Sequence, residues 1–144
     1  MNTATDGALR LSPREALAAS MVLMAAADER GMTDAELARM KRLVADLPAF
    51  GGVGSDEVEI ASEVVLGLLA EQDGLDQATR LIREALPPRL RETAYLLACE
   101  IAAADGEANQ EELRLLQDLR IALDLDRLIA GAIERAARAR YQVI

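Results

Sequence analysis

The segment Ala25-Ala26-Ala27-Asp28 closes an apolar run early in the chain, and the segment Ala102-Ala103-Ala104-Asp105 closes a similar run near its end. Beyond the two segments the match resumes after a one-residue deletion, so that Glu36-Leu37 aligns with Glu112-Leu113. A unit this long that occurs only twice favours two halves about an approximate two-fold axis, because solenoid proteins need at least about three shorter units. The pattern predicts an internal duplication of a helix-turn-helix unit, an arrangement that allows the two aspartates to meet.

The composition favours an all-helical fold. The chain has 144 residues, is rich in Ala and Leu, and contains four Pro; its aromatic residues are Phe50, Tyr95 and Tyr141. Helix formers therefore dominate over the β-branched and aromatic residues that favour strands. A chain of this length buries roughly 70% of the surface that its unfolded form exposes, which is enough for one core without a disulfide or a metal. We expect a single compact domain over residues 1–144, with residues 1–11 as a flexible N-terminal tail.

Capping and breaking residues divide the chain into about seven helices. Ser12 with Pro13, Thr33 with Glu36, and Asn109 with Glu112 are start signals, and Ser55 is a further expected N-cap. The expected helices cover residues 13 to 28 or 30, 33–47, 55–71, 75–86 and 88–104, then a helix capped by Asn109, and a last helix from 124 or 125 to about 140. Helical periodicity turns Val58, Val65, Leu66 and Leu69 inward in the third helix, and Ile129 and Ile133 inward in the last.

Asp28 and Asp105 each continue the apolar stripe of a predicted helix. The first stripe holds Leu17, Met21, Met24 and Ala25, and the second holds Leu90, Ala94, Leu97, Ala98 and Ile101. Both aspartates lie in the last turn, where the partial negative charge of the helix end disfavours a carboxylate by up to about 1 kcal/mol. Further acids follow at once, namely Glu29, Asp34 and Glu36 in the first unit and Glu107, Glu111 and Glu112 in the second. Such carboxylates repel each other unless a cation lies among them.

Two interpretations fit these acids. In the first, they bind a hard divalent cation, Ca²⁺ before Mg²⁺, because oxygen ligands are abundant while the chain contains no histidine and one cysteine, which excludes zinc. The spacing is not that of an EF-hand loop. In the second, Asp28 and Asp105 accept hydrogen bonds from nearby backbone N–H groups or cap the next helix, and the glutamates complete capping boxes.

The second unit also carries a family resemblance. The small-residue helix, the turn Ala104-Asp105-Gly106-Glu107 and the following helix with Glu112-Leu113 resemble the TerB-like tellurite-resistance domains, over about residues 11–125. The resemblance implies a compact seven-helix domain of cytoplasmic bacterial stress-response systems, with an acidic, calcium-binding surface and a role in assembling other proteins near the membrane.

The family's acidic positions fall on Asp28, Glu36, Asp105 and Glu112, to which Glu107 of the turn is added as a candidate metal ligand. The first copy departs from the pattern, because it reads Asp28-Glu29-Arg30-Gly31 where the second has Asp-Gly-Glu. We therefore expect the second copy to be the better site.

Several classes of function are disfavoured. A formal net charge of -9 disfavours nucleic acid and anionic membranes as partners, since both require a basic surface. No apolar run approaches the ~20 residues that cross a bilayer, and the lone Cys99, expected as a small core residue, suits a reducing compartment, so we expect a cytoplasmic protein. Without histidine, the Ser-His-Asp and Cys-His arrangements are impossible, and we expect no enzyme.

Two functional hypotheses follow. The first is a non-enzymatic TerB-like module whose junction carboxylates bind a divalent cation and so control a surface for other proteins, such as a membrane-associated stress complex. The alternative is a metal-free scaffold or co-chaperone-type interaction domain that presents the same acids to a basic protein. A third class, a carboxylate hydrolase, requires a deep pocket around the acids. The oligomeric state does not follow from the sequence.

Overall fold

The first long helix, α2 (Pro13–Ala26), is buried on every side. The computed structural model describes residues 9–27, 31–104, 106 and 108–144. Ser12 caps α2 in a complete capping box with Glu15, as predicted. Every residue from Ala16 to Ala25 is buried, so the burial is wider than the single stripe expected from the sequence. The reason is that α2 contacts five other helices.

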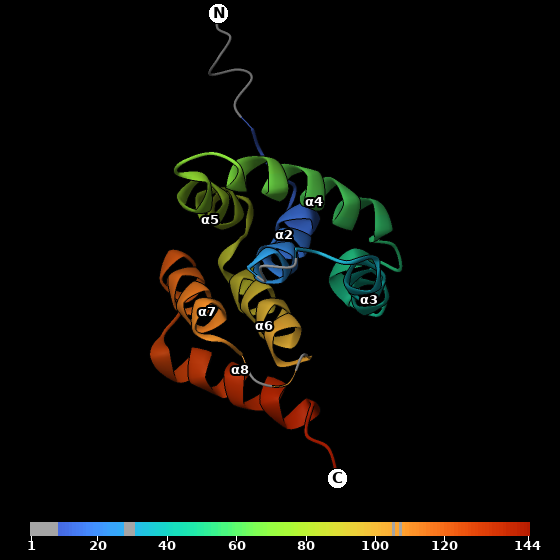
Figure 1. The fold of residues 1–144 in the computed structure, drawn as a ribbon, viewed down its shortest axis with the longest axis vertical. Helices are drawn as coiled ribbons and strands as arrows, with labels where there is room; N and C mark the ends of the chain where they lie inside the picture. Colours follow the sequence, from blue (N-terminus) through green and yellow to red (C-terminus); the bar gives the residue numbers. More distant parts are fainter. Residues whose placement is uncertain (1–8, 28–30, 105, 107) are drawn as a thin grey trace, which may run out of the picture.

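Two central helices organise the molecule. Helix α2 packs against α6 (Pro88–Ala104), and the pair lies between α3 (Asp34–Ala45) on one side and α7 (Gln110–Ala122) on the other (Figure 1). Helices α4 (Ser55–Leu69) and α5 (Gly74–Ala85) cover one end of the molecule, and α8 (Arg127–Arg140) covers the other.

The packing has the same order in both halves. Helix α4 packs on α2 as α8 packs on α6, so α2, α3 and α4 correspond to α6, α7 and α8. This arrangement agrees with the predicted duplication. Within the described residues the chain is all-helical, with seven α-helices and one short 3-10 helix, η1 (Pro48–Phe50), and it forms one compact domain.

Most helix boundaries lie close to those predicted, and α6 covers residues 88–104 as expected. Two starts were wrong. The N-cap of α4 is Gly54 and not Ser55; its φ of 145° suits glycine, and an added Cβ would lie 2.6 Å from Val44 Cγ2. Helix α8 begins at Arg127 because Asp124 adopts a left-handed φ of 56° after α7, and Asp126 then caps α8.

Two apolar residues face solvent against expectation. Leu66 is 44% exposed because α4 packs through Val58, Ala61, Val65 and Leu68, which places Leu66 away from the core. Ile129 is 39% exposed because α8 packs through Ala130 and Ala137. Ile133 is partly buried against the core, as expected. Both exposed side chains therefore lie on outer faces of the molecule.

Gly74 is the most closely packed of the described glycines. A Cβ at this position would lie 1.7 Å from the backbone oxygen of Leu68, whereas a Cβ at Gly67 would meet nothing within 4 Å. We predict that Gly74→Ala lowers the free energy of unfolding by about 1–3 kcal/mol through overpacking. Gly67→Ala is the matched control and should raise it by up to about 1 kcal/mol, because alanine favours the helix. Urea unfolding measures both; equal effects of the two variants would contradict the packing described.

Candidate functional site

The junction before α3 is held by a capping box. Thr33 Oγ1 accepts a hydrogen bond from the Glu36 N–H (3.1 Å), and Glu36 Oε1 accepts one from the Thr33 N–H (3.0 Å). The Thr33 hydroxyl also donates to Glu36 Oε1 (3.1 Å). Gly31 precedes this box with a left-handed φ of 73°, which explains the glycine at that turn. The local sequence therefore fixes the position of the Glu36 carboxylate.

The junction before α7 repeats this geometry. Asn109 Oδ1 accepts a hydrogen bond from the Glu112 N–H (2.8 Å), and Glu112 Oε1 accepts one from the Asn109 N–H (3.0 Å). Gly106 has a left-handed φ of 96°, like Gly31 in the first junction. Glu112 is only 7% exposed, whereas Glu36 is half-buried, so the second junction holds its glutamate more deeply.

The described acids of the junctions lie in favourable positions. Asp34 and Glu36 belong to the first turn of α3, and Glu111 and Glu112 belong to the first turn of α7. The partial positive charge of a helix N-terminus stabilises carboxylates there, typically by about 0.3–1 kcal/mol each. The capping role that the second interpretation assigned to Glu36 and Glu112 is confirmed.

The remaining predicted ligands, Asp28, Asp105 and Glu107, lie outside the described residues. In the part of the chain that the structure describes, no group of three or more acidic, histidine or cysteine side chains is placed to hold a metal ion. Helices α3 and α7 lie on opposite sides of the central pair (Figure 1), so Glu36 and Glu112 belong to two separate junctions. The metal site stays a prediction that centres on each junction by itself.

A polar contact between α6 and α8 was not predicted. Glu100 is 5% exposed, and its Oε1 and Oε2 lie 2.9 and 3.0 Å from Arg140 Nε. Neither residue belongs to the candidate ligands that the sequence predicts. The hydrogen bond to Glu100 raises the pKa of Arg140. A glutamate on a buried helix face needs a cation or hydrogen-bond donors. The position of Glu100 within the apolar run of α6 was therefore the sequence feature that could have predicted a basic partner.

Tyr95 and Cys99 lie at the same helix contact. The Tyr95 hydroxyl donates to Glu134 Oε2 at 2.6 Å, and burial followed by this hydrogen bond raises the pKa of Tyr95 above its usual range. Burial also raises the pKa of the Cys99 thiol to about 12. Cys99 is a buried core residue, as predicted, and its thiol stays protonated at neutral pH, which makes it a poor nucleophile.

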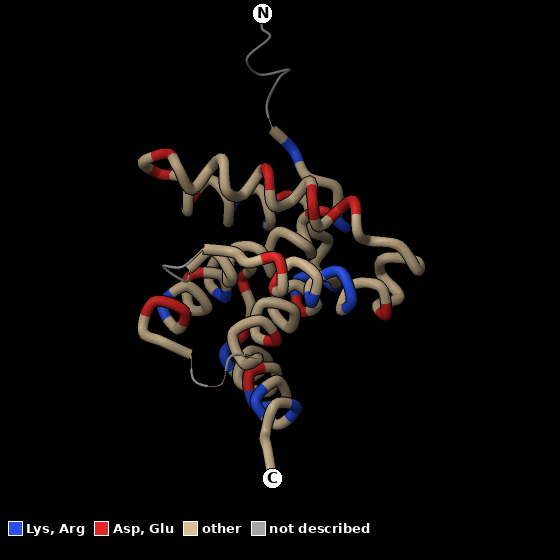
Figure 2. Tube along the Cα trace, turned by 45° about the vertical axis from the view of Figure 1, so that its right-hand side comes forward, with Lys and Arg blue, Asp and Glu red and all other residues tan. Residues whose placement is uncertain are grey.

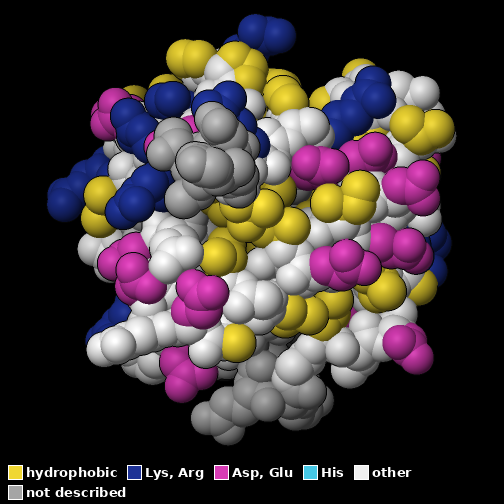
Figure 3. Space-filling model, turned by 90° about the horizontal axis from the view of Figure 1, so that it is seen from above, with side chains coloured by type: hydrophobic (Ala, Val, Ile, Leu, Met, Phe, Trp, Pro, Cys, Tyr) yellow, Lys and Arg dark blue, Asp and Glu magenta, His cyan; other side chains and the backbone are white. Residues whose placement is uncertain are grey.

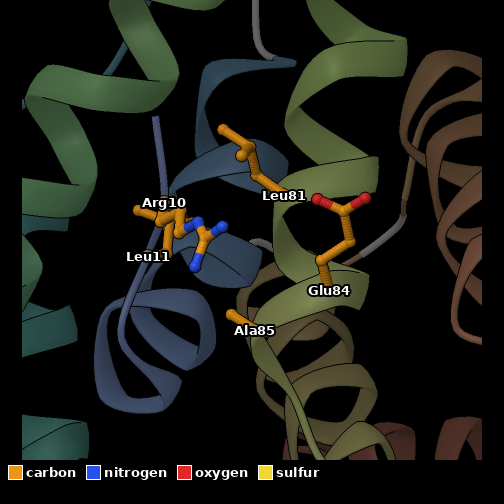
Figure 4. Close-up of a pocket in the computed structure, with 5 residues that line it drawn as sticks. All are labelled: Arg10, Leu11, Leu81, Glu84 and Ala85. Atoms are coloured by element: carbon orange, nitrogen blue, oxygen red, sulfur yellow. The ribbon is translucent and has the colours of Figure 1, made fainter. Parts of the chain in front are cut away.

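Two surface depressions flank the segment before and at the start of α2. The first, of about 330 Å³, lies between Arg10 and Leu11 and three residues of α5, Leu81, Glu84 and Ala85 (Figure 4). The second, of about 360 Å³, is lined by Ser12, Pro13, Arg14, Leu17, Ala49, Glu57 and Leu90. Neither is lined by Glu36 or Glu112, so neither supplies the pocket around the junction acids that a hydrolase requires.

Comparison with known proteins identifies the family. The model of the family described as tellurite resistance protein TerB matches residues 14–134, and the chain belongs to this family. No curated protein and no solved structure matches the chain. Among the described residues, none of the helices combines the length and apolar character needed to span a bilayer.

The raised pKa of Cys99 should make the stability of the fold depend on pH in the alkaline range. Its unfolded thiol ionises near pH 8.5–9, whereas the folded thiol holds its proton up to about pH 12. The unfolded chain then binds fewer protons, so stability falls as pH rises through this window. We predict that, between about pH 8 and pH 10, the wild type loses about 1–2 kcal/mol more of its free energy of unfolding than Cys99→Ala does. Denaturant titrations at each pH measure the difference, and parallel curves would contradict it.

Proposed function

We propose that this TerB-family chain is a non-enzymatic protein-interaction module whose junction carboxylates bind Ca²⁺. The observation that carries the proposal is that both junctions hold a glutamate at the same place, Glu36 before α3 and Glu112 before α7, by the same capping geometry. A carboxylate has two oxygens and about four lone-pair sites, so a capping glutamate can still offer an oxygen to a cation. Prepositioned ligands lower the cost of binding.

The second junction is the stronger candidate. Asp105 and Glu107 precede Glu112 by a few residues, and Glu112 is more deeply buried than Glu36. Carboxylate ligands favour Ca²⁺, with Mg²⁺ as the second choice because it demands a stricter octahedral geometry. The corresponding acids of the first junction are Asp28 and Glu36. A bound cation would offset the repulsion of the acids and restrain α7 relative to α6.

The charge of the chain bears on its partners. A net charge of -9 favours a basic protein surface over nucleic acid as a partner. TerB is not known as a family of enzymes. We propose that this member acts by assembling other proteins, for instance in a membrane-associated complex. The setting that we propose is a bacterial stress response such as tellurite resistance. We assign it to the cytoplasm, where a free thiol such as that of Cys99 is stable.

A metal-free scaffold or co-chaperone-type interaction domain is the second candidate. It is favoured by one observation, which is that both capping boxes are complete without a cation. In this case the acids of the first turns serve the helix termini and present negative charge to a partner.

Glu112→Gln separates the two candidates, because glutamine preserves a capping box but removes the charge. We predict that Ca²⁺ raises the melting temperature of the wild type, with a stabilisation of about 2.7 kcal/mol when free Ca²⁺ exceeds the dissociation constant about 100-fold. Glu112→Gln and Asp105→Asn should lose this shift and the heat of Ca²⁺ binding in calorimetry. Both variants should fold like the wild type without Ca²⁺.

Asp118→Asn is the matched control, because it removes an exposed carboxylate from the middle of α7, and it should keep the full response. If millimolar Ca²⁺ leaves the wild-type melting curve unchanged, the cation site is refuted and the metal-free scaffold is supported.

A further inference from the structure

The outer face of α4 is acidic and partly apolar. Asp56, Glu59 and Glu63 are exposed on this helix, and so are the apolar side chains of Ile60 and Leu66. Helix α4 contains no Lys or Arg, and Figure 2 shows only acidic residues among its charged positions. On the molecular surface, seen from the end that α4 and α5 cover, hydrophobic side chains lie between rows of Asp and Glu (Figure 3). This face, the α4 face, consists of these five residues.

The outer face of α8 has the opposite charge. Arg127, Arg135 and Arg138 are exposed, and Leu128 is the most exposed large apolar residue of any described helix, at 81%. The same helix also exposes four small residues, namely Gly131, Ala132, Ala136 and Ala139. We call these residues the α8 face. The small side chains leave the backbone accessible to a second helix, while the arginines border the contact.

We propose that the α4 face of one copy of this chain docks on the α8 face of a second copy. The charges of the two faces are complementary, because α4 carries acidic residues and no Lys or Arg, whereas α8 is predominantly basic. Each face also exposes apolar side chains that the contact would cover. The proposal does not depend on the cation site.

The position of the two faces determines the type of assembly. Helices α4 and α8 cover opposite ends of the longest axis of the molecule (Figure 1), so a chain cannot satisfy both faces with one partner. Such a head-to-tail contact is heterologous, and it produces open chains unless a rotation closes them into a ring. The weight-average mass should therefore keep rising with concentration and not level off at a dimer.

The contact is small and electrostatic. Each helix is about 20 Å long, and one helix pair buries less than the ~1,200 Å² of a stable interface, so the association is weak. Glu59 of the α4 face already pairs with Lys41 at 2.6 Å, whereas Glu63 and Arg135 are exposed, oppositely charged residues near the middle of α4 and of α8. Salt should weaken the contact because both charges are exposed.

A charge exchange tests the proposal. We predict that the wild-type mass in sedimentation equilibrium rises at least about two-fold above the 15.5 kDa monomer towards ~1 mM protein in about 50 mM NaCl, and returns to the monomer at about 0.5 M NaCl. Glu63→Arg alone and Arg135→Glu alone should both be monomeric. An equimolar mixture of the two variants should associate again, because each supplies the complement that the other lacks. Circular dichroism melts verify that both variants fold.

Asp118→Arg provides the matched control, since it makes the same charge change on an exposed residue of α7 and should associate like the wild type. If Glu63→Arg does not fold, the milder Glu63→Gln replaces it, and this variant should weaken association about several-fold. A wild type that stays monomeric under these conditions overturns the proposal. This holds even if the α4 face binds a different basic protein. Association that persists in both single variants, or a mixture that stays monomeric, also overturns it.

Discussion

The packing of α2 against α6 is the contact on which the rest of the structure depends. From Ala16 to Ala26, α2 has no charged residue, and its alanines and Ser20 allow neighbouring helices to approach closely. A helix that is apolar all round must be covered all round, so α3, α4 and α5 enclose it together with α6. Each fully buried Leu or Met side chain contributes roughly 1.5–3 kcal/mol, which makes this pair the main source of stability.

The same constraint places the charged groups of the fold. Helix α6 carries one buried carboxylate, Glu100, and Arg140 at the end of α8 neutralises it, so the contact that covers α6 also satisfies its charge. The described acids of the two junctions lie in the first turns of α3 and α7. Glu36 of α3 is half-buried there, and Glu112 of α7 is buried. Among the described residues, charge is thus concentrated at the junctions and on the outer faces of the molecule.

Local signals predicted much of this fold. Pro88 and the apolar run after it located α6, and the capping pairs located α2, α3 and α7, because these interactions involve residues close in sequence. The start of α8 and the exposure of Leu66 and Ile129 depend on the left-handed Asp124 and on which side each helix packs, and these are tertiary effects. For the candidate site, the capping of Glu36 and Glu112 was predictable, whereas the partner of Glu100 comes from 40 residues further along the chain. Cation binding requires ligands from several segments, and spacing alone does not determine it.

Native-state hydrogen exchange tests the central claim most directly. If α2 and α6 form the centre on which the other helices depend, the amides of residues 17–24 and 94–101 should exchange last. Their opening free energy should equal that of global unfolding. The amides of α3 and α8 should exchange earlier, through local opening that leaves the central pair intact. Exchange of α2 amides before those of α3 or α8 would contradict the account.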